Sequence, residues 1–350
     1  MKTVDLRSDT ISRPTADMRQ AMAAAVVGDD VFGEDPTINA LQERIAELTG
    51  KEAALFVTSG TQGNQVSLNA HTRPGQEVIC NSDCHIFNYE SGAAAMLSGV
   101  QLNALPGTNG VITLEQIRLN LRPADDHYPQ TGLICLENTH NRAGGTIYPL
   151  EEIRRISAWA REQGISLHLD GARLWNASVA TGISIAEYAA YFDSVSLCFS
   201  KGLGAPVGSV VAGPRDFIAR CHFYRKAYGG GIRQGGILAA AALYALDHHV
   251  ARLAEDHARA KRLAAGLAAI PGLRVDLNTV QTNILIFEVE ESVCGAAEMV
   301  GRLGEEGILC FDFGPQRIRM VFYLEIGDED VDYTLEKTAL VMARLKGGKR

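Results

Sequence analysis

The sequence predicts an α/β protein in which a large domain with a mainly parallel, mixed sheet is followed by a smaller α+β domain. Two observations lead to this prediction. Between Ala53 and Ala212, short apolar stretches alternate with amphipathic stretches at helical spacing, which is typical of parallel strands covered by helices on both faces. After a long helical stretch from Ile237 to about Leu267, shorter strands and helices follow. We therefore expect an N-terminal segment with helices at 1–45, a large domain at 46–245 and a small domain at 246–350.

The composition is that of an ordinary globular chain of 350 residues, with 46% hydrophobic and 21% charged residues and a formal net charge of −8. No basic block stands out, so we expect no nucleic-acid partner. No apolar run is long enough to span a membrane, and the N-terminus lacks the apolar region of a secretory signal. The seven cysteines are scattered and odd in number, which predicts free thiols in a cytoplasmic protein. Cys80 and Cys84 have no second pair at zinc spacing, so we expect no metal site built from cysteines and assign no metal ligands.

The N-terminal part begins with an extended segment, Asp5 to Pro14, and continues into a helix through Met18, Met22 and Val26. A turn-rich loop at 28–36 follows. We expect Thr37 to cap the next helix, whose apolar residues recur at helical spacing up to Gly50.

The large domain then alternates between strands and helices. The expected strands are 53–57, 77–80, 100–105, 133–137, 165–170, 194–199 and 207–212, and the expected helices are one through Val66 and Leu68, 88–97, 114–121 and 150–162. In the small domain, we expect strands at 273–277, 283–288 and 317–323 and helices at 296–305 and 329–346.

The loop Thr58–Asn64 joins a strand to a helix and consists of small and polar residues. This is the geometry of a phosphate site, because free N–H groups and the positive end of the helix dipole point at the anion. A plain connection between strand and helix is the alternative for this loop.

Lys201 follows the apolar strand that ends at Phe199 and precedes a glycine-rich turn. A lysine at this place is either a surface residue at a strand end or an amine that forms a Schiff base. Asp170 ends another strand, 31 residues earlier. Open α/β sheets bind their ligands at the carboxyl ends of the strands, so the phosphate loop, the carboxylate and the lysine are expected at one edge. Pyridoxal 5′-phosphate needs an anion site, an acid for its pyridine nitrogen and a lysine for its aldehyde, and these three groups together indicate that cofactor.

Seven motifs along nearly the whole chain resemble those of the low-specificity L-threonine aldolases, which are pyridoxal enzymes of the aspartate-aminotransferase fold, or fold type I. The motifs are Asp5–Thr10, Val27–Pro36, Ser59–Asn64, Leu136–Asn141, Asp170–Arg173, Ser200–Leu203 and Gly229–Gln234. The resemblance implies retro-aldol cleavage of L-threonine, L-allo-threonine and related 3-hydroxy amino acids to glycine and an aldehyde. It also implies an active site at a dimer interface and a homotetramer.

The resemblance implies a role for each matching residue. Lys201 is expected to form the Schiff base, Asp170 to pair with the pyridine nitrogen, and Gly60 and Thr61 to hold the phosphate. His85 is expected to stack on the pyridine ring near the reacting hydroxyl, with His127 as a second active-site histidine. The base is His85, His127 or a water between them.

The remaining expected roles concern anions. Ser8, Arg173 and Arg319 are expected to bind the substrate carboxylate, since arginine suits a carboxylate in a bidentate manner. Arg173 is also expected beside the cofactor. Lys226 and Arg233 match basic positions near the cofactor phosphate, where they reach it across a subunit interface.

Two departures from the family pattern bear on the substrate. Phe32 stands where the family shows a tyrosine, and Phe322 and Tyr323 follow Arg319 where the family shows threonine and histidine. We expect them to shift the preference toward bulkier substrates. An aminotransferase, a β-eliminating lyase and a non-catalytic binding protein on the same scaffold are the alternatives to an aldolase.

Overall fold

The computed structural model describes residues 2–347 and is built around a seven-stranded sheet with strand order β2-β8-β7-β6-β5-β3-β4. The strands are β2 (Ala53–Val57), β3 (Glu77–Asn81), β4 (Gln101–Leu105), β5 (Thr131–Glu137), β6 (Ser166–Gly171), β7 (Ser194–Cys198) and β8 (Ser209–Gly213). Only β8 runs antiparallel to its neighbours, β2 and β7, within the described sheet. The prediction of a mainly parallel mixed sheet is therefore confirmed.

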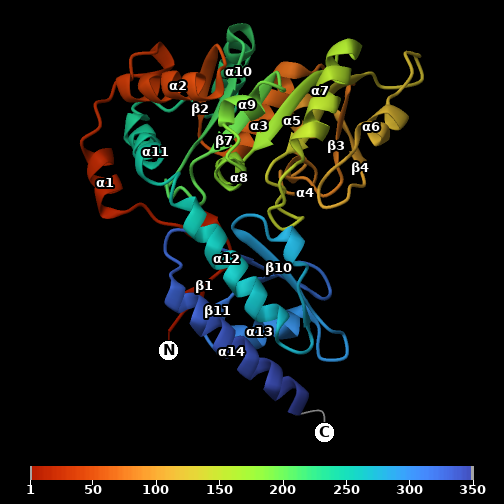
Figure 1. The fold of residues 1–350 in the computed structure, drawn as a ribbon. Helices are drawn as coiled ribbons and strands as arrows, with labels where there is room; N and C mark the ends of the chain where they lie inside the picture. Colours follow the sequence, from red (N-terminus) through yellow and green to blue (C-terminus); the bar gives the residue numbers. More distant parts are fainter. Residues whose placement is uncertain (1, 348–350) are drawn as a thin grey trace.

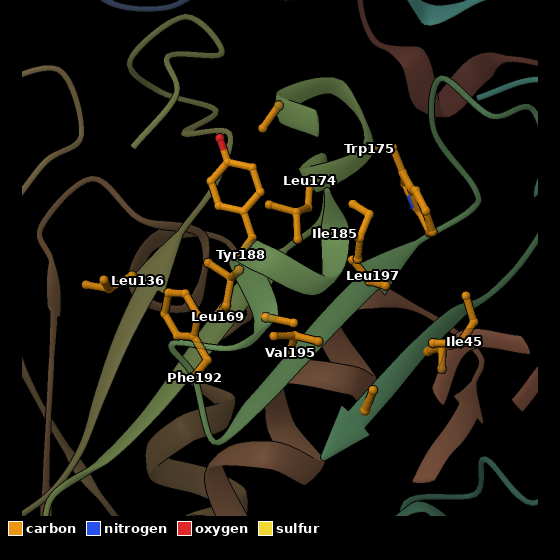
Figure 2. Packing of buried hydrophobic residues seen from close by; sticks show 14 of the residues in the cluster. Ile45, Leu136, Leu169, Leu174, Trp175, Ile185, Tyr188, Phe192, Val195 and Leu197 are labelled. Carbon is orange, nitrogen blue, oxygen red and sulfur yellow. The ribbon is translucent and has the colours of Figure 1, made fainter. Parts of the chain in front are cut away.

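Helices cover both faces of this sheet, and neighbouring strand residues divide between two cores. Phe56 packs in the main cluster with α2 (Pro36–Thr49), α7 (Leu150–Gln163) and α11 (Gly236–His248), whereas Leu55 packs with α3 (Gly60–His71) and α10 (Arg215–Ala227). Figure 2 shows how Leu169, Val195 and Leu197 of the central strands meet residues of α8 (Leu174–Thr181) and α9 (Ile185–Ala189). This alternation holds the strand ends, and the site that they carry, in a rigid frame.

A second unit lies beyond α12 (Leu253–Ala268), which leads from the large sheet into it (Figure 1). It holds the antiparallel sheet β12-β13-β10-β9 with α13 (Ala296–Glu305) and α14 (Asp328–Gly347). The strands of this sheet are β9 (Leu273–Arg274), β10 (Ile284–Val289), β12 (Phe311–Asp312) and β13 (Arg317–Val321). A smaller α+β unit at the C-terminal end was expected and is found.

The N-terminal segment packs with this second unit. β1 (Val4–Asp5) pairs in parallel with β11 (Ile308–Leu309), and Val4 and Leu6 are buried in the core of the second unit. The helices α1 (Ala16–Ala23) and α2 instead contact α11 of the first unit. The domain boundaries expected between residues 45 and 46 and between residues 245 and 246 stay a prediction.

Several predicted elements were wrong in detail. The single helix expected over 88–97 is two helices, α4 (His85–Asn88) and α5 (Ala93–Ser98), because Ser91 and Gly92 adopt positive φ angles of 55° and 70°. The helical stretch from 237 is interrupted between α11 and α12. Asp35 caps α2 instead of Thr37: its Oδ1 accepts from the N–H groups of Thr37 and Ile38, with Pro36 in the first turn.

The remaining helix of the large sheet is α6 (Leu114–Asn120), which was expected. Six elements were not expected from the sequence, namely α8, α9, α10, β1, β11 and β12. Among residues 2–347, no helix combines the length and the apolar character that crossing a membrane requires.

Candidate active site

The predicted groups meet at the carboxyl ends of β2, β6 and β7. Gly60, Thr61, Asp170 and Lys201 line one cavity of about 210 Å³, which we call the inner cavity. Strands β6 and β7 are parallel neighbours, and β2 runs in the same direction, so their ends open on the same edge. This is the edge at which open α/β sheets place a ligand.

The phosphate end of the inner cavity is the first turn of α3. Ser59 caps this helix, its Oγ accepting from the Gln62 N–H at 3.1 Å, and the N–H groups of the first turn have no partner in the helix itself. A Cβ atom on Gly60 would meet only Ser209 Oγ, at 3.7 Å, and this buried hydroxyl has no hydrogen-bond partner. An unpartnered hydroxyl beside open N–H groups suits a phosphate.

Asp170 is 3% exposed and lies in the floor of the cavity. Its Oδ2 accepts from Asn64 Nδ2 at 2.8 Å, and its Oδ1 accepts from the Ala172 N–H at 3.1 Å. Both oxygens are thereby oriented, and the carboxylate can hold a protonated ring nitrogen. Asn64 was not identified from the sequence, although it stands within the quoted motif Ser59–Asn64.

The Lys201 amine has no hydrogen bond or salt bridge to another described residue, whereas the backbone carbonyl of Lys201 accepts from the Gly204 N–H at 2.8 Å. The side chain lines two adjacent cavities. The second, which we call the outer cavity, has about 340 Å³ and also contains His85. An unpaired amine between a phosphate site and a second compartment can hold an aldehyde there. The inner cavity therefore fits pyridoxal 5′-phosphate.

His85 begins α4, where its N–H donates to Glu137 Oε2 at 2.7 Å. Its Nδ1 lies 2.7 Å from Glu90 Oε1, which leaves Nε2 free. Burial lowers the pKa of His85, but the hydrogen bond to Glu90 and the charges of Asp170 and Glu90 outweigh burial and raise it above its ordinary value. Neither Glu90 nor Glu137 was identified from the sequence.

His85, Glu90 and Asp170 also have the donor atoms of a metal site, within 4.8 Å of one another. Asn64 Nδ2 donates to both carboxylates, however, and its Oδ1 accepts from Ser196 Oγ at 3.1 Å, which fixes the orientation of the amide. A cation among these groups would face N–H hydrogens. We interpret the cluster as a hydrogen-bonded network.

The outer cavity brings together the three residues expected to bind a carboxylate, Ser8, Arg173 and Arg319. Arg173 is held bidentately by Asp9, from Nε to Oδ2 at 2.7 Å and from Nη2 to Oδ1 at 2.6 Å. Burial raises the pKa of Asp9, but the charge and hydrogen bonds of Arg173 outweigh it and hold this pKa below its ordinary value. Arg173 therefore has the two hydrogens of Nη1 and one hydrogen of Nη2 left for a ligand.

Arg319 is 8% exposed and has no carboxylate partner among the described residues. Its Nη1 donates to Asn141 Oδ1 at 2.7 Å and its Nη2 to the Arg7 carbonyl at 3.0 Å, whereas its Nε has no partner. Burial and the neighbouring Arg173 lower the pKa of Arg319 to about 10. A buried cation without a counter-charge is costly, so an anion fits beside it.

Three expected residues are not brought to these cavities. His127 lies on a loop with its side chain 87% exposed, paired with Asp125. Lys226 lies in the last turn of α10, and Arg233 pairs with Asp29 at 3.0 Å and lies near the Phe32 ring. None of the three lines the inner or the outer cavity.

Phe322 and Tyr323 do not line the outer cavity, and their expected effect on substrate preference stays a prediction. Phe322 and Tyr323 are 0% and 4% exposed and belong to the core of the second unit, and the Tyr323 hydroxyl donates to the Asp5 carbonyl at 2.7 Å. Aromatic residues do line the outer cavity, but they are others, namely Tyr89, Phe311 and Phe313.

A larger cavity of about 550 Å³ lies elsewhere and is lined by Arg142, Arg274 and Arg317, among other residues. Its Arg142 is paired with Asp83 at 3.2 Å, and Lys201 and Asp170 do not reach it. We place the site at the smaller pair of cavities because only they combine the amine, the acid and the phosphate cradle.

Comparison with known proteins shows the family of the chain and its fold. A family model described as beta-eliminating lyase matches residues 5–291. The chain is 45% identical to low-specificity L-threonine aldolase 1 of Arabidopsis thaliana, covering 96% of this chain and 95% of the relative. It is 42% identical to the low specificity L-threonine aldolase of Escherichia coli K12, covering 94% and 96%. Its fold matches the structure of Leishmania major threonine aldolase with a TM-score of 0.81 at 22% identity, over 98% of both chains.

Proposed function

Because the chain belongs to the beta-eliminating lyase family and, within it, to the low-specificity L-threonine aldolases, we propose that it cleaves L-threonine and L-allo-threonine to glycine and acetaldehyde with pyridoxal 5′-phosphate as cofactor. Related 3-hydroxy amino acids give glycine and the corresponding aldehyde. The observation that carries this proposal is the meeting of Lys201, Asp170 and the first turn of α3 at one cavity, next to the unpaired Arg319.

The cofactor site uses residues at the strand ends. Gly60 and Thr61 would hold the phosphate through their N–H groups, Asp170 would keep the ring nitrogen protonated, and Lys201 would hold the aldehyde. When bound, the cofactor withdraws electrons from Cα of the amino acid, so that the Cα–Cβ bond can break.

The substrate carboxylate lies in the outer cavity. Arg319 supplies the net positive charge, because Asp9 neutralises Arg173. Arg173 Nη1 and the Ser8 hydroxyl add donors on the same wall. This fixes the amino acid with its β-hydroxyl toward the face where His85 stands.

His85 Nε2 takes the proton of the β-hydroxyl as the Cα–Cβ bond breaks and the aldehyde leaves. Its Nδ1 is occupied by Glu90, so Nε2 is the ring nitrogen available for proton transfer. A proton returned to Cα completes glycine. His127 stays a candidate for the second histidine of the family, although its side chain is exposed in this chain.

Lys226 and Arg233 act across a subunit interface in this proposal. The segment that carries them is tied to the 28–36 loop by the buried ion pair of Arg225 and Asp30, at 2.7 Å. Exposed apolar side chains surround it, namely Val26, Phe32, Phe223 and Ile237. We propose a homotetramer, which light scattering would detect as four chains of 37.7 kDa.

Six buried cysteines are free thiols, namely Cys80, Cys84, Cys135, Cys198, Cys221 and Cys310. This supports the proposal of a cytoplasmic protein with reduced thiols.

A product assay tests the function. An aldolase releases glycine and acetaldehyde, an aminotransferase releases a keto acid and the aminated cofactor, and a β-eliminating lyase releases ammonia and a keto acid. Stoichiometric glycine and acetaldehyde from L-threonine support the proposal. Either of the other product sets, or no turnover in the presence of added cofactor, contradicts it.

A further inference from the structure

Glu90 is a buried carboxylate that does not touch the substrate in the proposed mechanism but contacts the base, His85. It is 2% exposed and accepts hydrogen bonds from three side chains. Its Oε1 lies 2.7 Å from His85 Nδ1 and 2.8 Å from Asn64 Nδ2, and its Oε2 lies 2.6 Å from Gln65 Nε2.

The backbone turns Glu90 inward. It stands between α4 and α5, and the next two residues, Ser91 and Gly92, have φ angles of 55° and 70°. A positive φ at a serine is uncommon and costs free energy. The two residues with positive φ angles directly follow Glu90, whose carboxylate is buried.

Asn64 joins Glu90 to the cofactor acid. The two hydrogens of its Nδ2 serve two different carboxylates, Glu90 Oε1 and Asp170 Oδ2, each at 2.8 Å. Its Oδ1 is occupied by Ser196 Oγ. The side chain of Asn64 is 2% exposed, so its orientation is set by these bonds and not by solvent.

We propose that Glu90 is a positioning residue for His85, holding the imidazole through Nδ1 so that Nε2 faces the substrate hydroxyl, and that Asn64 couples this carboxylate to Asp170. The inference rests on the proposed function for the role of Nε2. A carboxylate that accepts from one ring nitrogen fixes the tautomer and leaves the other nitrogen for proton transfer.

Charged groups on several elements face His85. They are Glu90 in the α4–α5 connection, Asp170 on β6, Lys201 after β7, and Glu137 at the end of β5, which holds the His85 N–H. Glu90 and Asp170 stabilise the imidazolium, whereas Lys201 opposes it. Neutralising Glu90 removes a nearby negative charge and leaves at most a neutral acceptor for the charged ring, so the titration midpoint of His85 falls.

The variant Glu90→Gln tests this with little change in shape. A glutamine oxygen can still accept from Asn64, and its new amide can donate to Gln65, whose Oε1 has no partner at present. The charge is lost and the packing is kept. Glu77→Gln is the matched control, because Glu77 is also a fully buried glutamate, paired with Arg122 away from the site.

The experiment follows the imidazole signals of histidine-labelled, full-length protein by NMR against pH, without substrate, with His85→Asn identifying the His85 signal. We expect Glu90→Gln to lower the midpoint of His85, and to lower kcat of the holoenzyme by about 10- to 100-fold while KM changes far less. Glu77→Gln leaves the His85 midpoint and kcat unchanged.

An unchanged His85 midpoint in Glu90→Gln overturns the proposal, even if activity falls, because lost activity alone can come from structural damage. Should Glu90→Gln fail to fold, Asn64→Ser replaces it. Without the amide donor, the charge on Glu90 acts fully on His85, so the titration midpoint of His85 rises. An unchanged midpoint in Asn64→Ser contradicts the coupling. The titration needs no turnover. Its result can therefore be interpreted even if the protein does not cleave L-threonine, so failure of this inference is distinguishable from failure of the proposed function.

Discussion

Arg173 and Asp9 form a buried, bidentate ion pair that ties the N-terminal segment to the active site. Asp9 Oδ2 also accepts from Asn283 Nδ2 at 3.1 Å, so one carboxylate joins the segment before α1, the start of α8 and the approach to β10. The N-terminal strand pairs with β11 a few residues earlier. Ser8 and Thr10, on either side of Asp9, line the outer cavity, so this segment forms part of its wall.

Asp9→Asn is expected to lower the free energy of unfolding by about 3–5 kcal/mol, because it leaves the charge of Arg173 buried without its partner. Chemical denaturation measures this. Asp5→Asn is the control: its pair with Arg7 is partly exposed, and such pairs contribute about 0–1 kcal/mol. Equal stabilities of the two variants would contradict the importance given to the buried pair.

Arg319→Gln is expected to separate activity from stability. Loss of a charged donor to the substrate carboxylate lowers kcat/KM by about 10- to 100-fold. The free energy of unfolding does not fall, because the substitution removes a buried charge that has no counter-charge. Steady-state kinetics and denaturation check the two parts. Arg317→Gln, on the same strand but outside the outer cavity, serves as control, and an equal kinetic loss there would refute the assignment.

His85→Asn and His127→Asn are expected to differ strongly. His85 lines both cavities, whereas the His127 side chain is exposed on its loop. Replacing the positioned base lowers kcat by about 10²- to 10⁴-fold, and the effect at His127 is smaller. Single-turnover rates with L-allo-threonine measure both. A larger loss at His127 would move the base to that residue.

Stability is expected to fall on mild acidification. Burial lowers the pKa of His71 to about 3 and those of His168 and His257 to about 4. The unfolded chain therefore takes up these protons first, and stability present above pH 6.5 is lost as the pH falls toward 4. Asp256, whose pKa burial raises to about 6, acts in the opposite direction, as do Asp30 and His85, whose pKa values are also raised, but the three histidines have the larger shifts. A melting temperature at pH 5 equal to or above that at pH 7 would contradict this.

The parts of the fold that could be predicted are those with local signals. Buried parallel strands are continuous apolar runs, and the acid and amine at their ends meet because parallel strands end on one edge. The strand pair β1–β11 could not be predicted, since it joins two-residue strands from opposite ends of the chain. The interruption between α11 and α12 contains no glycine or proline, so the sequence has no local signal for it. The side chain of His249 contacts the Leu203 carbonyl at this point, with 2.7 Å between Nδ1 and the oxygen.

The site follows the same division. Position at a strand end and membership of a motif made three features predictable, namely Lys201, Asp170 and the Gly60 loop. Glu90 and Asp9 act through residues distant in sequence, and only the folded chain shows which charges they meet. Asp9 lies within the motif Asp5–Thr10, but no role was assigned to it. A polar residue that lies in a family motif without a role is a signal that could have identified Asp9 as part of the site.

The most direct test of the central claim is the absorbance spectrum of the purified protein with added pyridoxal 5′-phosphate, followed by L-allo-threonine with coupled detection of acetaldehyde, for the wild type and Lys201→Ala. We predict a visible band of covalently held cofactor and aldehyde release in the wild type, and the loss of both in Lys201→Ala. A wild-type protein with neither band nor aldehyde, or a Lys201→Ala variant that retains both, would contradict the account of the site.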